Sequence, residues 1–345
     1  MLPHIERILD AARTAPSQEN LQPWRFVVSG DEVSFGIDHE RNTSPDQAMA
    51  RVALGAAIEC ACVSAARVGA TVRVQAPRDG ALVTMSFTDP KRLPDPDLAR
   101  TRRATNRRVY DGRALDDATL RALRDAVPQR DLAQTQWYGR ERVRALGPLV
   151  EQAEELFYLD DGLRERALSA IRFDVKDREL VSRGLPLACL ELQAAERAAL
   201  VGIRKPVVSG VNASAVKTMA ARARKQMESA SGVLVITVKG EDPMTDVDVG
   251  RTMQRAWMAL TQRGLAAHPM TKLITLGIAP SSAGTENDLV KALLDAFRRT
   301  FPNVPDDTRI AMLMRIGWAE APSFRPGRYE LAESCSEVDT SASGS

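Results

Sequence analysis

The densest basic run in this sequence lies at residues 100–108, where five of nine residues are arginine. The guanidinium group of arginine presents its N–H donors in a planar fork that matches two phosphate oxygens, and each charge-assisted hydrogen bond contributes about 1.5–3 kcal/mol. Two or three such side chains can hold a phosphomonoester, so the run indicates a compact anion site. A solvated basic loop is the alternative interpretation.

A second segment, residues 15–26 (Ala-Pro-Ser-Gln-Glu-Asn-Leu-Gln-Pro-Trp-Arg-Phe), joins a helix end to a strand. Pro16 ends the helix, and the aromatic and β-branched residues at the end of the segment predict the strand. Ser17 and Asn20 can bond to nearby backbone or to a ligand. The junction is therefore either a ligand-binding turn or a loop anchored by a buried tryptophan.

Two further segments come from the last third of the chain. Residues 264–271 (Gly-Leu-Ala-Ala-His-Pro-Met-Thr) follow a long predicted helix and are expected to form a loop. The backbone N–H groups of a loop can serve a ligand, because helical N–H groups already have partners. Residues 315–319 (Arg-Ile-Gly-Trp-Ala) end a predicted strand, and Arg325 and Arg328 follow it.

These four segments together resemble the nitroreductase family, which binds flavin mononucleotide (FMN). Residues 15–26 are similar to its PSSxNxQPW turn, and residues 103–107 (Arg-Ala-Thr-Asn-Arg) are similar to its R-x-S/T-x-R/K signature. Residues 264–269 are similar to its GLxxxP loop, and residues 315–328 to its closing strand and arginine tail. The resemblance implies an α+β fold, a nitroreductase-like three-layer α-β-α sandwich.

The resemblance also implies which residues contact FMN. The first basic residue of the signature meets the ribityl phosphate in the family, as do the tail arginines. The last basic residue lies near the pyrimidine edge of the ring, which would place Arg107 where its charge stabilises anionic reduced flavin. Since the flavin carries the chemistry, no catalytic side chain is expected. The predicted cofactor-binding residues are Pro16, Ser17, Gln18, Asn20, Arg103, Thr105, Arg107, Pro269, Met270, Thr271, Arg325 and Arg328.

The sequence departs from the family after the proline of the GLxxxP segment. The family often has an acidic residue and a glycine there, whereas Met270, Thr271 and Lys272 follow Pro269 in this chain. The contact with flavin N5 and the choice of substrate are therefore left open. We interpret His268 as a packing or capping residue rather than an acid or base, because flavin chemistry does not require one.

Composition excludes several classes of function. The formal charge of +2 over 345 residues argues against general nucleic-acid or membrane-surface binding. No apolar run approaches about 18 residues without charges, and the start of the chain does not resemble a signal peptide, so we predict a cytoplasmic protein. The four cysteines lack metal-ligand or disulfide spacing, and Asp246 and Asp248 are interpreted as a surface turn or helix cap rather than a metal site.

Hydrophobic patterns predict the elements that position these segments. Residues 150–230 are rich in helix formers and are expected to be mainly helical. The other predicted helices cover residues 5–15, 51–69, 117–127 and 250–264, and the predicted strands cover residues 71–75, 81–87, 231–239 and 309–317.

Several of these elements recur along the chain. The helical stretches Gly55–Gly69 and Gly250–Gly264 have the same separation between their glycines. The helices expected at residues 5–15 and 117–127 each carry an Asp-Ala pair shortly before a proline, and each leads to a tryptophan. Two fused copies of one unit explain this recurrence. The alternative is that any two amphipathic helices can be aligned in this way.

A Pro-rich connector at residues 89–96 marks the boundary between the two copies. We predict a first nitroreductase-like half at residues 1–95 and a second at residues 96–330. The second half contains the helical insertion at about 150–230, which is a candidate lid. Residues 331–345 are small and polar and are expected to be disordered.

The copies divide the site between them. Ordinary nitroreductases are homodimers in which the turn and the arginine signature of each flavin site come from different subunits. Here the first half keeps the turn, and the second keeps the arginines and the Gly-Leu segment. This arrangement resembles the Acg-like subgroup, in which one chain mimics the dimer. A monomeric pseudo-dimer is then possible, and further association into a homodimer stays open.

The resemblance implies an FMN-dependent oxidoreductase. It would transfer a hydride from NADH or NADPH through flavin N5, in a ping-pong reaction, to a small acceptor such as a nitroaromatic, a quinone or an activated alkene. One alternative is a protein that sequesters or stores FMN, with the helical insertion closed over the flavin. Another is a flavin-free structural relative whose arginines are merely solvated.

Overall fold

The computed structural model describes residues 1–42, 47–75, 77, 80–91, 102–130, 132–176, 179–204, 212–278 and 288–338. Its α-helices are α1 (Pro3–Ala12), α2 (Gln47–Arg67), α4 (Asp117–Ala126), α5 (Arg140–Leu159), α6 (Asp161–Ser169), α7 (Ala194–Arg204), α8 (Ala213–Glu228), α9 (Pro243–Gln262), α10 (Lys272–Ile278) and α11 (Asp288–Arg299). Its strands are β1 (Trp24–Ser29), β2 (Glu32–Ile37), β3 (Thr71–Gln75), β4 (Val83–Thr88), β5 (Ala133–Tyr138), β6 (Ile171–Arg172), β7 (Leu185–Pro186), β8 (Gly232–Lys239), β9 (Ala266–Pro269), β10 (Thr308–Gly317) and β11 (Cys335–Glu337). Short 3₁₀ helices are η1 (Gln18–Asn20), η2 (Leu187–Leu190) and η3 (Leu331–Glu333).

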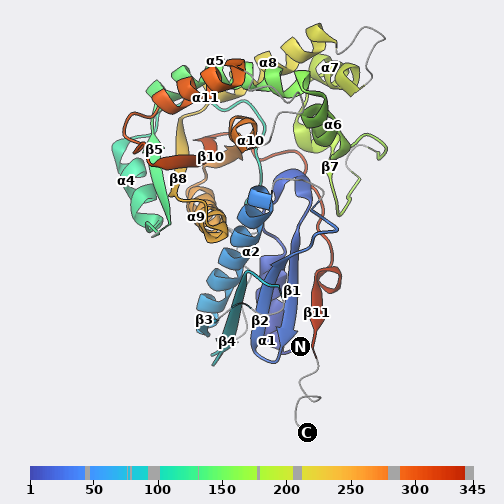
Figure 1. Ribbon diagram of the computed structural model, residues 1–345, viewed down its shortest axis with the longest axis vertical. Coiled ribbons are helices and arrows are strands. Elements are labelled where there is room, and N and C mark those ends of the chain that lie inside the picture. Colours follow the sequence, from blue (N-terminus) through green and yellow to red (C-terminus); the bar gives the residue numbers. More distant parts are fainter. Residues whose placement is uncertain are drawn as a thin grey trace.

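Two main sheets lie at different levels along the long axis of the molecule (Figure 1). The first has the strand order β11-β1-β2-β4-β3, and the second has the order β5-β8-β10-β9. Helix α9 contacts the second sheet from one side, and α5 contacts it from the other. Helices α2 and α9 pack together between the two sheets. The mixture of helices and sheets confirms the predicted α+β class.

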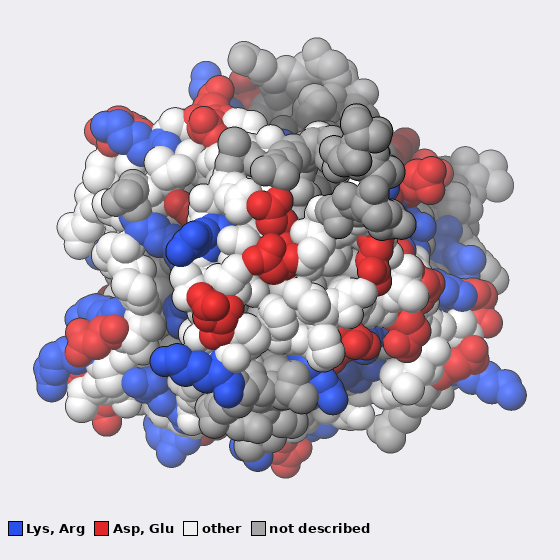
Figure 2. Space-filling model, turned by 90° about the horizontal axis from the view of Figure 1, so that it is seen from below, with Lys and Arg blue, Asp and Glu red and all other residues white. Residues whose placement is uncertain are grey.

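Helix α2 is buried because it is apolar on all sides, as expected for a helix in a protein core. Among the described residues it is the one helix long and apolar enough to cross a membrane, but 83% of its most apolar window is buried inside the fold. Figure 2 shows acidic and basic side chains interspersed over the described part of one face of the molecule. The apolar surface of α2 is buried against other elements of the fold, such as α9 and α1.

A pair of glycines sets the close crossing of α2 and α9. A Cβ added at Gly55 would lie 2.0 Å from the carbonyl oxygen of Val247, and one added at Gly250 would lie 1.9 Å from that of Val52. Each glycine thus faces the residue three positions before the other glycine, so the contact is reciprocal. Two fused copies related by a local two-fold axis would produce this reciprocity. The duplication itself stays our proposal.

Charged side chains flank the crossing. Glu59 of α2 has no exposed surface and pairs with Arg130 at 2.9 Å and Arg251 at 3.3 Å. Asp246 of α9 is buried as well and pairs with Arg51 at 2.8 Å. The interpretation of Asp246 as a surface turn or helix cap is therefore wrong, because α9 begins at Pro243 and carries this carboxylate toward α2.

The segment after Leu331 is ordered where the structure describes it. Strand β11 pairs in parallel with β1, and the N–H of Phe26 donates to the carbonyl of Ser334 at 2.8 Å. The prediction of disorder is thus wrong for residues 331–338, because the free edge of β1 supplies backbone partners for a polar segment. Residues 339–345 lie outside the described residues, as do Arg100, Thr101 and most of the connector at residues 89–96.

Candidate functional site

A cavity of about 280 Å³ lies where segments from both predicted halves meet. This volume is close to the lower end of the range of about 300–1,000 Å³ that is common for small-molecule sites. Its apolar wall comes from α2, α5, α7, α8 and α9, and includes Met49, Val52, Ala53, Val150, Ala153, Phe157, Leu200, Met219, Ala223, Met253 and Trp257. Helices α5, α7 and α8 belong wholly or in part to the insertion at about 150–230, so this insertion contributes one wall of the cavity.

Eight of the twelve predicted cofactor-binding residues line this cavity. They come from three separate segments, the turn before β1, the stretch after the connector, and the end of β9 with the residues that follow. They are Pro16, Ser17, Gln18, Thr105, Arg107, Pro269, Met270 and Thr271. The structure therefore brings the core of the three sequence motifs to one place.

The turn before β1 has an unusual backbone. Glu19, Asn20 and Gln22 all have positive φ, at 54°, 57° and 53°. Residues with a Cβ adopt this left-handed region at a cost, and such strain concentrates at functional sites. Ser17 holds the turn, since its Oγ accepts a hydrogen bond from the N–H of Gln22 at 2.9 Å.

Asn20 and Arg328 do not line the cavity, although both were predicted to contact the cofactor. The Asn20 amide donates to the carbonyls of Ser182, Gly184 and Gly327 at 3.0–3.3 Å. Arg328 donates to the Asn20 side-chain oxygen at 2.7 Å. These two side chains instead tie the turn to the C-terminal segment and to the loop before β7.

Arg103 and Arg325, which were also predicted to bind the phosphate, lie outside the cavity lining as well. Arg103 is buried, donates to the carbonyl of Thr14 at 3.0 Å, and stacks over the ring of Trp257 at 4.8 Å. Arg325 donates to the carbonyl of Arg102 at 2.8 Å. In this structure their described contacts are with the protein itself.

The segment expected as a loop after α9 is instead partly a strand. Residues 266–269 form β9, which pairs with β10 in register His268↔Arg315. The N–H of Met270 donates to the carbonyl of Leu313 at 2.8 Å, so this N–H is occupied. The loop prediction is wrong at β9 because the exposed edge of β10 offers a partner that local sequence does not reveal.

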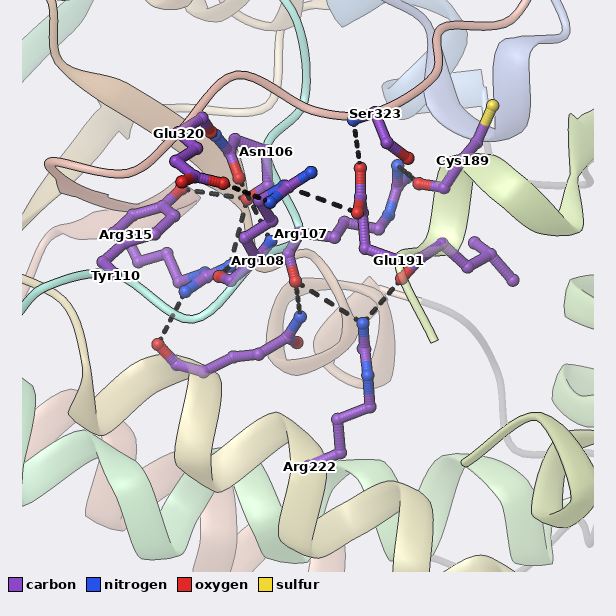
Figure 3. A network of polar contacts seen from close by, with 12 residues as sticks. Asn106, Arg107, Arg108, Tyr110, Cys189, Glu191, Arg222, Arg315, Glu320 and Ser323 are labelled. Atoms are coloured by element: carbon purple, nitrogen blue, oxygen red, sulfur yellow. Dashed lines mark hydrogen bonds and ion pairs between the residues drawn. The ribbon is translucent and has the colours of Figure 1, made fainter. Parts of the chain in front are cut away.

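Backbone contacts to β9 place Arg107 at the cavity. The N–H of Asn106 donates to the carbonyl of Ala267 at 3.0 Å. Thr105 and Ala267 form an isolated parallel β-bridge. The Arg107 carbonyl accepts a hydrogen bond from the Gln226 side chain, and its guanidinium donates to the carbonyl of Cys189 at 3.1 Å (Figure 3). One hydrogen bond thus holds the backbone of residue 107, and another holds its side chain.

The positive charge of Arg107 has no carboxylate partner among the described residues. Burial lowers its pKa from 12.5 to about 10, so the guanidinium stays charged at neutral pH. Arg222 also lines the cavity, but Glu196 pairs with it at 3.0 Å. Arg107 thus contributes a charged guanidinium to the cavity lining, and among the described residues no carboxylate pairs with it.

Sequence reasoning missed a second group of titratable side chains on the cavity wall. Lys272 donates to Glu154 at 2.5 Å and lies 3.9 Å from the centre of the Tyr158 ring. Glu19 belongs to this group, because Lys272 and Arg166 both act on its charge. No local pattern marks these residues, since they lie far apart in the sequence. Within the described residues, no cluster of His, Cys, Asp and Glu could hold a metal ion.

Glu19 is expected to make stability depend on pH. Burial raises its pKa from 4.5 to about 7, against the lowering effect of Arg166 and Lys272. Between these two pH values the native state binds more protons than the unfolded state, so the free energy of unfolding falls as pH rises through this window. After a discount for the surface that faces the cavity, the loss is about 1–2 kcal/mol.

Urea unfolding at both ends of that window checks this expectation. Glu19→Gln should abolish this part of the pH dependence and should be more stable than the wild type above the window. The matched control is Glu40→Gln, at an exposed glutamate after β2, which should keep the wild-type dependence. A Glu19→Gln variant with the same pH dependence as the wild type would show that this carboxyl group is not the cause.

Comparisons with known proteins agree with the motif analysis in part of the chain. The family model described as "Nitroreductase family" matches residues 2–34, which run from α1 into the start of β2. One curated relative, an uncharacterized protein of Mycobacterium tuberculosis (strain CDC 1551 / Oshkosh), is 28% identical over 284 residues, which is 79% of this chain. The chain spans only 39% of that relative's length.

Solved structures were also matched over much of the chain. A nitroreductase with bound FMN from Bacteroides fragilis is 12% identical, with a TM-score of 0.38, and the match covers 70% of this chain and 97% of that one. The FMN and NADPH-dependent nitroreductase NfnB from a sphigopyxis species is 18% identical, with a TM-score of 0.37, and the match covers 68% and 95%. The match to the nitroreductase family model itself extends over residues 2–34.

Proposed function

We propose that this chain is an FMN-dependent oxidoreductase of the nitroreductase type. The observation that carries the proposal is a cavity that the turn at residues 16–18, Thr105 with Arg107, and residues 269–271 line together. Three motifs that resemble flavin-binding motifs of that family thus meet at one apolar pocket. The match of the family model to residues 2–34 supports the same assignment.

The residues present fit the ring end of FMN. Apolar side chains such as Val52, Phe157 and Trp257 offer a dry surface for a flat aromatic ring. Arg107 offers a cation with which no carboxylate of the described segments pairs. FMN supplies hydride transfer at N5 when it is bound. Arg107 would stabilise negative charge on the pyrimidine edge, while Pro16, Ser17, Gln18 and residues 269–271 would hold the ring from the opposite segments.

The remaining parts of the proposal concern the reaction partners. NADH or NADPH would be the electron donor, and a small nitroaromatic, quinone or activated alkene would be the acceptor. The reciprocal contact of Gly55 and Gly250 supports a fused pseudo-dimer that works as a monomer. Helix α2 is buried inside the fold, and the four cysteines, all in described segments, are free thiols. Both observations support a cytoplasmic protein.

One observation favours a second candidate function. The helical insertion contributes Val150, Ala153, Phe157 and Met219 to the cavity wall, so it covers the pocket on one side. A flavin held beneath these helices would be shielded from a second substrate. FMN sequestration or storage, with little turnover, is therefore the alternative to catalysis.

An absorbance spectrum of the purified protein before and after anaerobic NADPH addition tests the two functions. We expect an oxidised flavin band at about 450 nm that bleaches on addition of NADPH. A band that persists with NADPH and NADH, yet bleaches with dithionite, would favour sequestration. A protein that shows no band after reconstitution with FMN would contradict both functions.

A further inference from the structure

His268 and Arg315 face each other across strands β9 and β10. The Nε–H of Arg315 donates to Nδ1 of His268 at 3.1 Å. Arg315 has no exposed surface, and its other nitrogens donate to the carbonyls of Gln226 at 2.7 Å and Asn106 at 3.0 Å. The guanidinium also lies 4.0 Å from the centre of the Tyr110 ring, so its position is set from several sides (Figure 3).

This contact decides which nitrogen of His268 carries the proton. Arginine is a donor only, so Nδ1 of His268 must accept and cannot carry a hydrogen. In a neutral imidazole the proton then resides on Nε2. The Nε2–H tautomer of His268 therefore follows from the Arg315 contact, because the Nδ1–H tautomer could not accept this hydrogen bond.

The surroundings also keep the imidazole neutral. Burial holds the pKa of His268 well below its ordinary value of 6.5, and the charge of Arg315 acts in the same direction. Arg107, Arg222 and Lys272, the other cations near the ring, lower the pKa further. A doubly protonated His268 would place a positive charge beside the buried guanidinium of Arg315, so protonation is disfavoured at physiological pH.

The other ring nitrogen of His268, Nε2, remains available to a ligand in the cavity. His268 lines the cavity together with Arg107 and Gln226, and no described residue accepts a hydrogen bond from its Nε2. A polar N–H in an apolar pocket needs an acceptor from a bound molecule or from water. The neighbouring cation Arg107, which has no carboxylate partner in the described part of the chain, favours an acceptor that is anionic or electron-rich, such as a carbonyl or nitro oxygen.

We propose that His268 presents a neutral Nε2–H donor to a carbonyl-type or nitro-type oxygen of the bound ligand, and that Arg315 is the positioning residue that sets this tautomer. The oxygen belongs either to the flavin ring or to the electron acceptor. The identity of the ligand rests on the proposed function, whereas the tautomer rests on the Arg315 contact alone. Residue 268 thus acts as a fixed donor and not as an acid or base.

Nuclear magnetic resonance of ¹⁵N-labelled apo-protein tests the tautomer without any cofactor. The chain has three histidines, so a His268→Asn variant assigns the signal directly. We expect Nδ1 of His268 to be unprotonated, Nε2 to be protonated, and this pattern to persist from about pH 5.5 to about pH 8. A proton on Nδ1, or a titration near the ordinary histidine pKa, would overturn the inference even if the protein binds FMN.

Two variants test the donor. Asparagine at position 268 keeps an acceptor near Nδ1 for Arg315 but has no group at the Nε2 position, whereas glutamine places an amide N–H near Nε2. We expect His268→Asn to weaken ligand binding about 3- to 10-fold and His268→Gln to restore part of it. Thermal unfolding of both variants verifies that each is folded.

The readout separates the two sources of the oxygen. A rise in the Kd for FMN in His268→Asn assigns the oxygen to the flavin. An unchanged Kd with a raised KM for a quinone or nitroaromatic acceptor assigns it to the acceptor. Unchanged values of both constants would overturn the donor role. A wild type that does not bind FMN would contradict the proposed function and the donor role together, while the apo-protein spectrum still decides the tautomer.

Discussion

Replacing Gly250 by alanine is expected to lower the free energy of unfolding by about 3 kcal/mol or more, the largest stability effect that we predict for a change of one carbon atom. The added Cβ would lie 1.9 Å from the carbonyl oxygen of Val52 and 2.9 Å from the N–H nitrogen of Ala56. These are backbone atoms, so no side chain can rotate away. The axes of α2 and α9 must separate, which loosens the core on both sides. Urea unfolding followed by circular dichroism measures the change.

Gly202 provides the matched control, because it also lies in a helix, α7. A Cβ there would meet only side-chain atoms, at 3.5 and 3.6 Å, which is ordinary contact. Gly202→Ala should keep or slightly raise stability, since alanine is the better helix former by about 1 kcal/mol. Equal stabilities of Gly250→Ala and Gly202→Ala would show that the close crossing of α2 and α9 is absent in solution.

Replacing Arg107 by alanine is expected to weaken FMN binding by about 100-fold and to lower the midpoint potential of the bound flavin by about 30–60 mV. The affinity estimate takes the loss of one charge-assisted interaction as about 3 kcal/mol. The potential falls because the cation favours the more negative, reduced state, and for a two-electron couple about 1.4 kcal/mol corresponds to about 30 mV. Fluorescence titration measures the affinity, and a xanthine oxidase-coupled dye titration measures the potential.

Arg107→Lys is the control for charge. Lysine keeps a cation but loses the planar fork, so part of the potential shift should be recovered while the affinity stays reduced. The free energy of unfolding should be measured for both variants, because Arg107 also donates to the carbonyl of Cys189. An unchanged midpoint potential in folded Arg107→Ala would remove Arg107 from the proposed electrostatic role.

Much of the local structure could be predicted from the sequence. The strands predicted at residues 231–239 and 309–317 correspond to β8 and β10, because short apolar runs rich in branched residues suit a strand that is buried on both faces. Helix α9 begins earlier than residue 250, at Pro243, since Asp242 caps its first turn by accepting from the N–H of Met244 at 2.7 Å. Helix ends depend on such single contacts and are therefore harder to predict.

The motif positions were also largely determined by the sequence. Pro16, Ser17, Gln18, Thr105 and Arg107 all line one cavity, and the family resemblance had singled out all five. The sequence could not distinguish these from Asn20 and the arginines at positions 103, 325 and 328, which have the same chemistry. Their contacts depend on which backbone carbonyls lie within reach, and that is decided by segments far away in the chain.

The sequence by itself determined most of the element types, the residues of the motif turns and the glycines that permit close packing, because these depend on local sterics and on side-chain chemistry. Only the tertiary structure decided that β11 returns to the edge of β1, that burial raises the pKa of Glu19, and that Arg315 selects the tautomer of His268. Each of these outcomes depends on groups brought together from distant positions. Desolvation and hydrogen-bond partners arise only when the chain has folded, so no local pattern contains them.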